Sequence, residues 1–386
     1  MPVKSPHDAD AAVESNPAPV GRGIRYEPCI DGWRAVAIAM VLLTHFFPYK
    51  QPPNTWVHLG KTGVTIFFII SGYLISLILF RAKEHMQEGR LTLGEALRRF
   101  YIRRVLRIAP IYYASIAAAF VIGAPGARER IWWLVTYTSN FGQVFFDLDF
   151  KTAGHFWSLA VEEQFYLLWP LAVLLAGAVA LGRTIRWLAT GSLVLILVTG
   201  ICGGSVWLMT MLPLGGASLA LAYGALLAYG RFYENGVSPA LVRISLWIGA
   251  PAFVCSQILW WRTGGMANGK LEMDQFEYKM LYVWSVVLFF GFLFVCSLNR
   301  ESILNRVLSF APLRYIGKIS YGIYVYHLLL DPYFYSIWSR LGLHPTLDHF
   351  SEGLLKSATT ILIAALSWHF FEKPILSLKE RLAPEV

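Results

Sequence analysis

The stretch TGVTIFFIISGYLISLILF, residues 62–80, carries no charged side chain and has the length of one helical crossing of a lipid bilayer. A helix of about 20 apolar residues can cross the hydrocarbon core because it satisfies its backbone hydrogen bonds internally. Nine further segments of this kind occur at 31–48, 105–124, 157–181, 187–203, 212–230, 241–261, 280–298, 316–338 and 354–371. The sequence therefore predicts an all-α, polytopic bundle of about ten transmembrane helices.

The composition of the whole chain of 386 residues also indicates a membrane protein. Hydrophobic residues make up 56% and charged residues 15%, and the mean hydropathy is +0.51. Soluble domains carry about 25% charged residues, so a soluble enzyme of this size is excluded. The aromatic stretch Ile131–Phe146 is too interrupted for a span, and we expect it at an interface or as a re-entrant segment.

The positive charge of the chain predicts its orientation. The formal net charge is +9. If the N-terminus is cytoplasmic, Lys and Arg in the inside loops outnumber those outside by about two to one, as the positive-inside rule requires. Both termini are then cytoplasmic, because ten crossings return the chain to its starting side. The lipid bilayer is the expected partner, and nucleic-acid binding is not needed to explain the charge.

The chain divides into a long membrane domain and two tails. Residues 1–28 are polar, contain several prolines and lack the pattern of a signal peptide, so we expect a disordered cytoplasmic tail. Residues 29–374 form the predicted transmembrane domain, and residues 375–386 a short cytoplasmic tail. The four cysteines show no CxxC pattern, so neither a disulfide framework nor a metal site is expected.

The first apolar segment contains ionisable groups, which are costly in hydrocarbon and therefore point to function. Asp31 and Arg34 stand at its start, and His45 follows eleven residues after the arginine. Eleven residues of α-helix make three turns plus about 20° and rise roughly 16 Å, so Arg34 and His45 share one face. A snorkelling arginine and a core histidine bonded to backbone are the structural alternative. The aligned pair favours function, because both groups must face protein or water.

Five arginines precede the third apolar segment and run into it. Arg98 and Arg99 fit a positive-inside anchor, whereas Arg103, Arg104 and Arg107 enter the apolar helix itself. Spacings of i, i+3 and i, i+4 place Arg103 or Arg104 on the same side as Arg107. Planar guanidinium groups match the oxygens of phosphate. The cluster therefore indicates a phosphate-bearing ligand that enters from the cytoplasm.

Two adjacent acids, Glu162 and Glu163, lie one to two turns inside the outer end of the fourth span. Because buried acids are expensive, we expect one to pair with a cation and the other to contact substrate. The spacing does not decide which does which.

Hydroxyl and imidazole groups also recur at helical spacing. Ser71 and Gly72 in the second span permit close helix contact. In the ninth span Ser320, Tyr324, His327 and Asp331 form one narrow stripe, which fits either a hydrogen-bond ladder between helices or a substrate path. The candidates for a substrate path are Asp31, Ser71, Tyr73, Ser158, Tyr324 and His327.

Taken together, these motifs resemble those of the acyltransferase-3 family of bacterial membrane acyltransferases. The chain holds in family order Arg34-x10-His45, FFIISGY from Phe67, RRVLRIAP from Arg103, WSLAVEEQFYLLWP from Trp157, SYGIYVYH from Ser320 and FEKP from Phe371. The match runs from about Ile30 to Pro374. No single motif is specific, whereas the ordered set is specific at the level of the family.

The resemblance implies an activity and a donor. Members of the family move acyl groups, most often acetyl from cytoplasmic acetyl-CoA, onto hydroxyls of surface glycans or other acceptors at the bacterial inner membrane. It implies that Arg34 and His45 are essential, and that Arg103, Arg104 and Arg107 belong to the acyl-CoA site. Acetyl-CoA or another acyl-CoA is therefore the expected donor substrate, without a metal.

The residues and the resemblance lead to one mechanistic hypothesis. Neutral His45 acts as general base toward an acceptor hydroxyl, and Glu162 or Glu163 orients it or holds the acceptor. A covalent relay through a tyrosine or serine also fits the sequence. Some members of the family carry a C-terminal SGNH hydrolase-like domain. Because this chain ends 12 residues after Pro374, we expect none here, with direct acylation or a separate periplasmic partner instead.

Two alternatives stay open at the level of sequence. Within the family, the acceptor can be a small molecule such as a macrolide rather than a polysaccharide. Outside it, a transporter or flippase of lipid-linked sugars also has ten or more helices with buried charge. A flippase has no need of acyl-CoA, so binding of acetyl-CoA separates the two classes.

Overall fold

The computed structural model describes residues 26–47, 58–202, 211, 215–262, 276–342 and 348–384, without the side chains of residues 178 and 276–280. Across these ranges the chain forms helices and no strand, which confirms the all-α prediction. Of the predicted N-terminal tail, residues 1–25 lie outside the described ranges.

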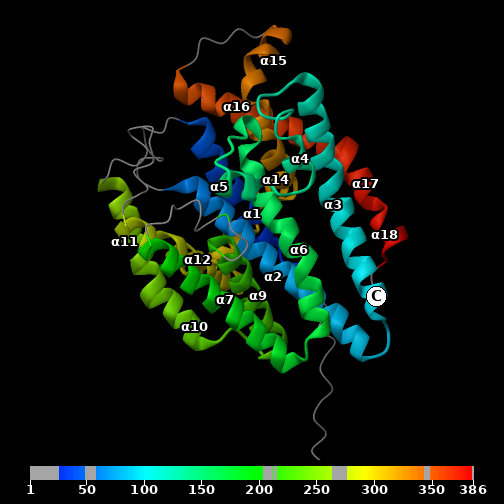
Figure 1. Ribbon diagram of the computed structural model, residues 1–386, viewed down its shortest axis with the longest axis vertical. Coiled ribbons are helices and arrows are strands. Elements are labelled where there is room, and N and C mark those ends of the chain that lie inside the picture. The colour runs from blue at the N-terminus through cyan, green and yellow to red at the C-terminus, as the bar shows by residue number, and fades with distance from the viewer. Residues whose placement is uncertain are drawn as a thin grey trace, which may run out of the picture.

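Ten longer helices make up the described part of the bundle (Figure 1). They are α1 (Pro28–Phe46), α2 (Leu59–Gln87), α3 (Leu93–Ile122), α6 (Trp157–Leu175), α7 (Ala178–Ile201), α9 (Gly216–Tyr233), α11 (Ala250–Arg262), α12 (Phe276–Leu298), α14 (Ala311–Leu330) and α16 (His349–Ser367). Shorter elements connect or extend them: α4 (Ile131–Val135), α5 (Ser139–Phe145), η1 (Lys151–Phe156), α10 (Pro239–Ile244), η2 (Ser245–Gly249), α13 (Ile303–Leu308), η3 (Asp331–Tyr333), α15 (Phe334–Arg340), η4 (Trp368–Glu372), α17 (Lys373–Ser377) and α18 (Lys379–Leu382).

Within the described ranges, eight helical stretches are long and apolar enough to cross a membrane. They are Pro28–Phe46, Leu59–Gln87, Leu93–Ile122, Lys151–Leu175, Val179–Ile201, Pro239–Arg262, Leu281–Leu298 and His349–Leu382. The protein is therefore a multi-pass membrane protein. The other two predicted spans, 212–230 and 316–338, correspond to α9 and α14, which hold several tyrosines and basic residues. The count of ten and the side on which the termini lie stay predictions.

Helix α2 runs through the middle of the bundle and packs against α1, α3, α6, α9 and α12. Its closest approach is to α9, where glycines face backbone. A Cβ on Gly72 would lie 2.0 Å from the carbonyl oxygen of Leu221, and one on Gly224 would lie 2.1 Å from that of Ile69. Side chains are sterically excluded at both positions, so the predicted packing role of the Ser71–Gly72 step is confirmed for Gly72.

Helix α3 begins well before the predicted span 105–124. A capping box at its N-terminus pairs the Thr92 side chain with the backbone of Glu95 and the Glu95 side chain with the backbone of Thr92. The helix then passes through Pro110 and ends at Gly123, whose φ of +68° suits a glycine. The basic cluster therefore lies in the first half of a continuous helix that already begins at Leu93.

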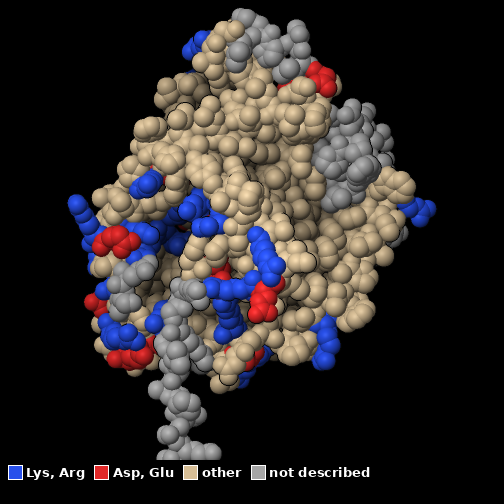
Figure 2. Space-filling view, turned by 180° about the vertical axis from the view of Figure 1, so that it is seen from behind, with Lys and Arg blue, Asp and Glu red and all other residues tan. Residues whose placement is uncertain are grey.

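The aromatic stretch 131–146 forms two short helices, α4 and α5, and does not make one continuous span. Tyr137, between them, has a φ of +53°, a left-handed conformation that interrupts a helix. In Figure 1 α15 and α16 lie at one end of the long axis and the α2–α3 connection lies at the other. Most Lys and Arg visible in Figure 2 gather toward the latter end, around a hollow, in agreement with the positive-inside pattern.

Candidate functional site: an arginine pocket and a histidine cluster

Five helices, α1, α2, α3, α6 and α14, enclose a cavity of about 140 Å³, which we name the arginine pocket. One wall is apolar and comes largely from α2. The polar lining is Arg34, Ser71, Arg104, Arg107, Ser158, Glu162, Tyr166, Ser320, Tyr321 and Tyr324. The structure thus brings together residues from five of the motifs that carried the family resemblance.

Three guanidinium groups make the pocket cationic. The guanidinium carbon of Arg104 lies 5.9 Å from the centre of the Tyr166 ring. The guanidinium carbon of Arg107 lies 5.2 Å from the centre of the Trp368 ring. Among the described residues, neither they nor Arg34 form an ion pair, although Glu162 shares the pocket. Three cations against one carboxylate leave a positive field, which attracts an anionic ligand.

Arg103 faces a different region from its two neighbours. Its Nε donates to the carbonyl oxygen of Ala383 at 2.8 Å, and Arg99 Nη1 donates to that of Pro384 at 3.1 Å. Consecutive residues on a helix point about 100° apart, so Arg103 and Arg104 cannot both face the pocket. Of the predicted donor-site arginines, the structure places Arg104 and Arg107 in the pocket and Arg103 against the C-terminal segment.

The two adjacent acids also separate. Glu162 lines the pocket and accepts a hydrogen bond from the Tyr166 hydroxyl, which lies 2.5 Å from Ser71 Oγ. Glu163 does not line it, and its Oε1 is buried with no hydrogen-bond partner among the described residues. Burial first, and then the Glu163 carboxylate, raise the pKa of the Tyr137 phenol above its ordinary value. Glu163 therefore faces the α4–α5 connection rather than the pocket.

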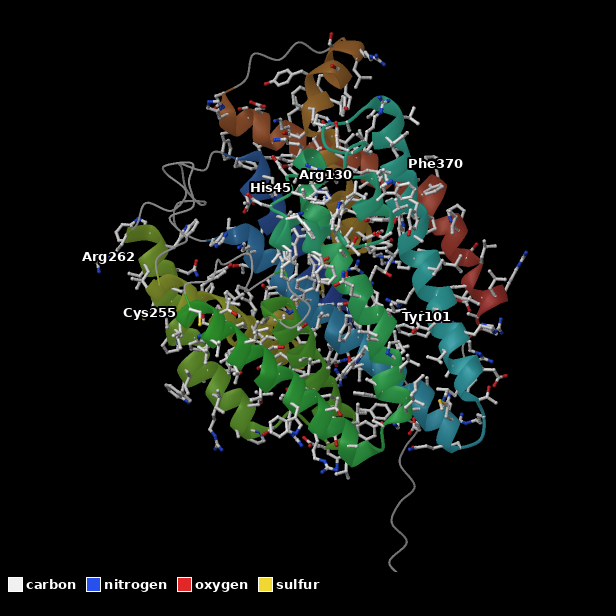
Figure 3. All side chains as sticks on the ribbon, in the orientation of Figure 1. His45, Tyr101, Arg130, Cys255, Arg262 and Phe370 are labelled. Atoms are coloured by element: carbon white, nitrogen blue, oxygen red, sulfur yellow. The ribbon has the colours of Figure 1, made fainter. Side chains whose placement is uncertain are left out.

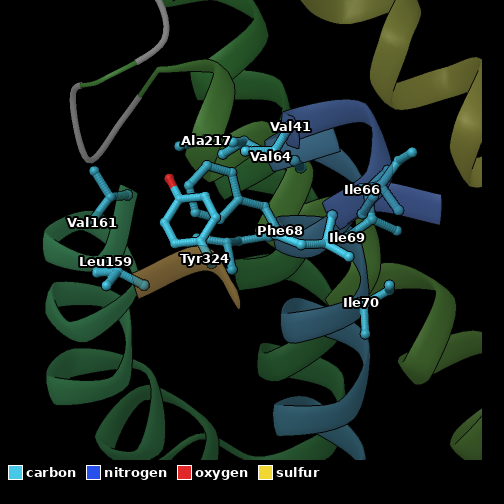
Figure 4. Close-up of a cluster of buried hydrophobic side chains, with 14 of the residues drawn as sticks. Val41, Val64, Ile66, Phe68, Ile69, Ile70, Leu159, Val161, Ala217 and Tyr324 are labelled. Atoms are coloured by element: carbon cyan, nitrogen blue, oxygen red, sulfur yellow. The ribbon is translucent and has the colours of Figure 1, made fainter. Parts of the chain in front are cut away.

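Ser158 and Tyr324 close one side of the pocket. Ser158 Oγ lies 2.6 Å from the Tyr324 hydroxyl, which also donates to the carbonyl oxygen of His155 at 2.9 Å. Figure 4 shows the Tyr324 ring between Leu159 and Val161 of α6 on one side and Phe68 of α2 on the other. We call the hydrogen-bonded pair Ser158 and Tyr324 the Ser–Tyr layer.

Beyond the Ser–Tyr layer, His45, His155 and His327 form a histidine cluster. The ring centre of His327 lies 5.1 Å from that of His45 and 4.7 Å from that of His155. Tyr324 contacts this cluster as well, with its ring centre 5.3 Å from His155. Figure 3 shows His45 toward the end of the molecule that carries α15 and α16. His45 and His327, predicted from separate motifs, thus lie together, outside the pocket lining.

Asp31 and Tyr73 make their hydrogen bonds outside the arginine pocket. Asp31 accepts a hydrogen bond from the Tyr26 hydroxyl at 2.6 Å. Tyr73 accepts one from Arg231 Nη1 at 2.6 Å, and Arg231 pairs with Glu27 at 2.9 Å. Neither Asp31 nor Tyr73 lines the arginine pocket. The contacts of Arg231 with Tyr73 and Glu27 tie the start of α1 to α2 and α9.

The predicted stripe of four groups in the ninth span is shortened in the structure. Ser320, Tyr324 and His327 lie on α14, whereas Asp331 falls in η3 and pairs with Lys356 at 2.9 Å. The α-helix ends there because Pro332 has no backbone N–H to continue the α-helical hydrogen bonds, and the chain goes on as a short 3-10 turn.

Sequence reasoning did not single out His155 or Tyr166. Tyr166 follows Glu162 by four residues, and i, i+4 pairs meet on a helix, so this contact could have been found from spacing. His155 precedes α6, in η1, and reaches the backbone of Val325 across 170 residues of sequence. No local pattern signals such a contact.

This fold and site define a class: a multi-pass, all-helical membrane protein with a cationic pocket beside buried histidines. The chain matches the model of an acyltransferase domain over residues 27–369. It therefore belongs to the acyltransferase-3 family, as the motifs indicated.

Curated relatives carry the same domain within longer chains. The chain is 29% identical over 385 residues to the peptidoglycan O-acetyltransferase OatA of Listeria monocytogenes, covering 91% of this chain and 56% of the relative. It is 28% identical over 376 residues to the O-acetyltransferase OatA of Staphylococcus aureus, covering 91% of this chain and 57% of the relative. The chain spans about half the length of the curated relatives it matches. No solved structure matches it.

Proposed function

We propose that the protein is an O-acyltransferase of the bacterial inner membrane. It transfers acetyl from cytoplasmic acetyl-CoA to a hydroxyl of an extracytoplasmic glycan, directly or through a separate partner. The observation that carries this proposal is the arginine pocket, in which Arg34, Arg104 and Arg107 line a cavity without ion pairs among the described residues. The names of the curated relatives, which are O-acetyltransferases, support the choice of acetyl and of glycan.

The size of the pocket indicates which part of the donor it takes. Sites for drug-sized ligands measure about 300–1,000 Å³, so a cavity of about 140 Å³ is too small for a whole coenzyme. It suits the narrow pantetheine arm, while the phosphates stay at the arginines. Guanidinium groups hold phosphate by paired, charge-assisted hydrogen bonds. Ser71, Ser158 and Ser320 supply hydroxyls along the pocket for the amides of the arm.

The chemistry follows from a neutral imidazole beside the thioester. His45 takes the proton of the acceptor hydroxyl as its oxygen attacks the acyl carbonyl, and the carbon–sulfur bond then breaks. The Ser–Tyr layer stands between the pocket and the histidine cluster, so the acyl group has to pass it. Direct passage of the thioester and a covalent relay through a hydroxyl both fit this arrangement.

The donor half of the proposal is tested by calorimetric titration of the detergent-solubilised protein with acetyl-CoA. We expect saturable binding that is weakened in Arg104→Gln and unchanged in Arg186→Gln, because Arg186 pairs with Glu234 on the exposed surface away from the pocket. Absence of binding to the wild-type protein contradicts the proposal and favours a transporter.

The acceptor half is tested by mass spectrometry and NMR of surface glycans from cells with and without the protein. We expect loss of ester-linked acetyl groups when the protein is absent. An unchanged pattern, together with acetyl-CoA binding, contradicts the glycan acceptor and favours a small molecule such as a macrolide.

A further inference from the structure

Two consecutive hydrogen bonds connect a serine of the arginine pocket to a carboxylate. The Tyr166 hydroxyl donates to Glu162 Oε1, one turn earlier on α6, and Ser71 Oγ lies 2.5 Å from the same hydroxyl. An ionised carboxylate only accepts hydrogen bonds and a phenol carries one hydrogen, so Ser71 is the donor in its bond to Tyr166. The hydrogen bonds therefore run from Ser71 to Tyr166 to Glu162, and the last group is a base.

The Ser71 hydroxyl stands at a fixed place in the pocket wall. Ser71, Tyr166 and Glu162 all line the pocket, and Ser71 and Tyr166 are buried. The backbone at Ser71 is held by its neighbour Gly72, which packs directly against the backbone of α9. A ligand that enters the pocket therefore meets a serine hydroxyl that is already bonded toward a base.

The other two serines of the pocket lack such a connection. Ser158 bonds the Tyr324 hydroxyl, but Tyr324 donates its hydrogen to the backbone carbonyl oxygen of His155, which is not a base. Ser320 Oγ is buried and has no hydrogen-bond partner among the described residues. Among the described serines that line the pocket, Ser71 is thus the one whose proton has a route to a carboxylate.

We propose that Ser71 is a nucleophile that takes the acyl group from acyl-CoA and holds it as an ester until the acceptor is acylated. This inference rests on the proposed function, and it selects a covalent relay over direct passage of the thioester. A serine hydroxyl is a weak nucleophile until a base takes its proton. Here Glu162 is that base, and Tyr166 carries the proton between the two.

The two half-reactions balance without a further reactant. In the first, Ser71 Oγ forms a bond to the acyl carbon while its proton moves to Tyr166 and the proton of Tyr166 moves to Glu162. The carbon–sulfur bond breaks with its electron pair on sulfur, and the proton returns through Tyr166 to that sulfur, so coenzyme A leaves as a thiol. In the second, the acceptor oxygen forms a bond to the acyl carbon, the bond from that carbon to Ser71 Oγ breaks, and the proton that the acceptor loses restores the serine hydroxyl.

The unchanged protein tests the inference directly. An ester on Ser71 lets the first half-reaction run backward, so isotopically labelled coenzyme A should be incorporated into acetyl-CoA in the absence of an acceptor. We expect this exchange in the detergent-solubilised wild-type protein. Mass spectrometry of the acid-quenched, digested protein should find one acetyl group on Ser71. Saturable binding of acetyl-CoA without exchange, or an acetyl group on a different residue, overturns the inference.

Three variants separate a nucleophile from a merely structural hydroxyl. Ser71→Ala removes the nucleophile, so we expect exchange to fall to background while acetyl-CoA still binds. Ser71→Cys should restore exchange, because a thiol is also a nucleophile. Tyr166→Phe keeps the serine but breaks the route of its proton, so the exchange rate should fall roughly 10²–10⁴-fold. Full exchange in Ser71→Ala contradicts the inference.

The matched control is Ser76→Ala. Ser76 is also a buried serine of α2 that bonds a side chain of α6, since Trp169 Nε1 donates to its Oγ at 2.9 Å. It does not line the pocket, so exchange is expected to equal that of the wild type. An equal loss of exchange in Ser76→Ala and Ser71→Ala would mean that helix packing is the whole role, and the inference would be wrong. Failure of the proposed function is distinct, because then the wild-type protein itself does not bind acetyl-CoA.

Discussion

The arginine pocket and the histidine cluster lie on opposite sides of Tyr324, and they differ in charge and in accessibility. The pocket has a cavity lined by Arg34, Arg104 and Arg107, whose charges have no ion pair among the described residues. The cluster is made of imidazoles in contact with one another, and two of its buried nitrogens have no hydrogen-bond partner among the described residues. The first suits binding of an anionic donor and the second suits proton chemistry. Variants can therefore separate binding from catalysis.

The largest effect is expected from His45→Ala in the histidine cluster. Removal of a general base lowers the rate by roughly 10²–10⁴-fold. Because His45 does not line the arginine pocket, acetyl-CoA should bind this variant as it binds the wild type. Acetyl transfer and calorimetric binding are measured on the same preparation. A variant that transfers acetyl at the wild-type rate would falsify the assignment of His45.

A smaller effect is expected in the arginine pocket, where Arg104 is compared with its neighbour Arg103. Hydrogen bonds to charged groups contribute about 1.5–3 kcal/mol, so Arg104→Gln should weaken acetyl-CoA binding by roughly 10–100-fold. Arg103→Gln should change it little, because Arg103 bonds the carbonyl oxygen of Ala383. Titration calorimetry measures both. Equal losses in the two variants would mean that the pocket does not hold the phosphates.

Tyr324→Phe tests the layer between the two regions. The hydroxyl contacts Ser158 and the carbonyl oxygen of His155, so its loss should cost about 1–3 kcal/mol of stability. We expect a lower melting temperature. We also expect faster hydrolysis of acetyl-CoA in the absence of an acceptor, which is measured by the appearance of free thiol. Ser158→Ala is the matched variant, because it removes the other hydroxyl of the pair. If neither variant changes hydrolysis, the layer does not separate the two regions.

The smallest effect is expected from Glu163→Gln. Glu163 does not line the pocket and its Oε1 has no hydrogen-bond partner among the described residues, so an amide of the same size should cost little activity. Glu162→Gln, by contrast, alters the one carboxylate that the described residues contribute to the lining of the pocket, and it should reduce transfer. Acetyl transfer by the two variants is compared at equal expression. The reverse order of effects would assign the functional role to Glu163.

Spacing along one helix predicted part of the site well. The structure places Arg34 and His45 on the same helix, α1, where Arg34 lines the pocket and His45 joins the cluster. The alignment of Ser320, Tyr324 and His327 also holds on α14. These predictions succeed because the geometry of an α-helix is regular, so residue separation fixes direction. Their roles in donor binding and catalysis stay predictions.

Residue spacing did not predict where a helix ends or which side chains meet between two helices. Asp331 left the stripe because α14 ends at Leu330. The hydrogen bonds of Asp31 to Tyr26 and of Tyr73 to Arg231 were not predicted, and the place of both residues on a substrate path stays a prediction. Those partners lie on other turns or other helices, and no pattern in the sequence brings them together.

The amino-acid sequence by itself determined the class of the protein. Long uncharged segments have to become helices in a bilayer, because no other backbone arrangement of a single segment satisfies its hydrogen bonds there. The ordered motifs then indicated the acyltransferase-3 family. The tertiary structure alone decided which member of each adjacent pair, Arg103 or Arg104 and Glu162 or Glu163, faces the pocket. Neighbours on a helix point about 100° apart, and only the packing of five helices fixes which direction leads into a shared cavity.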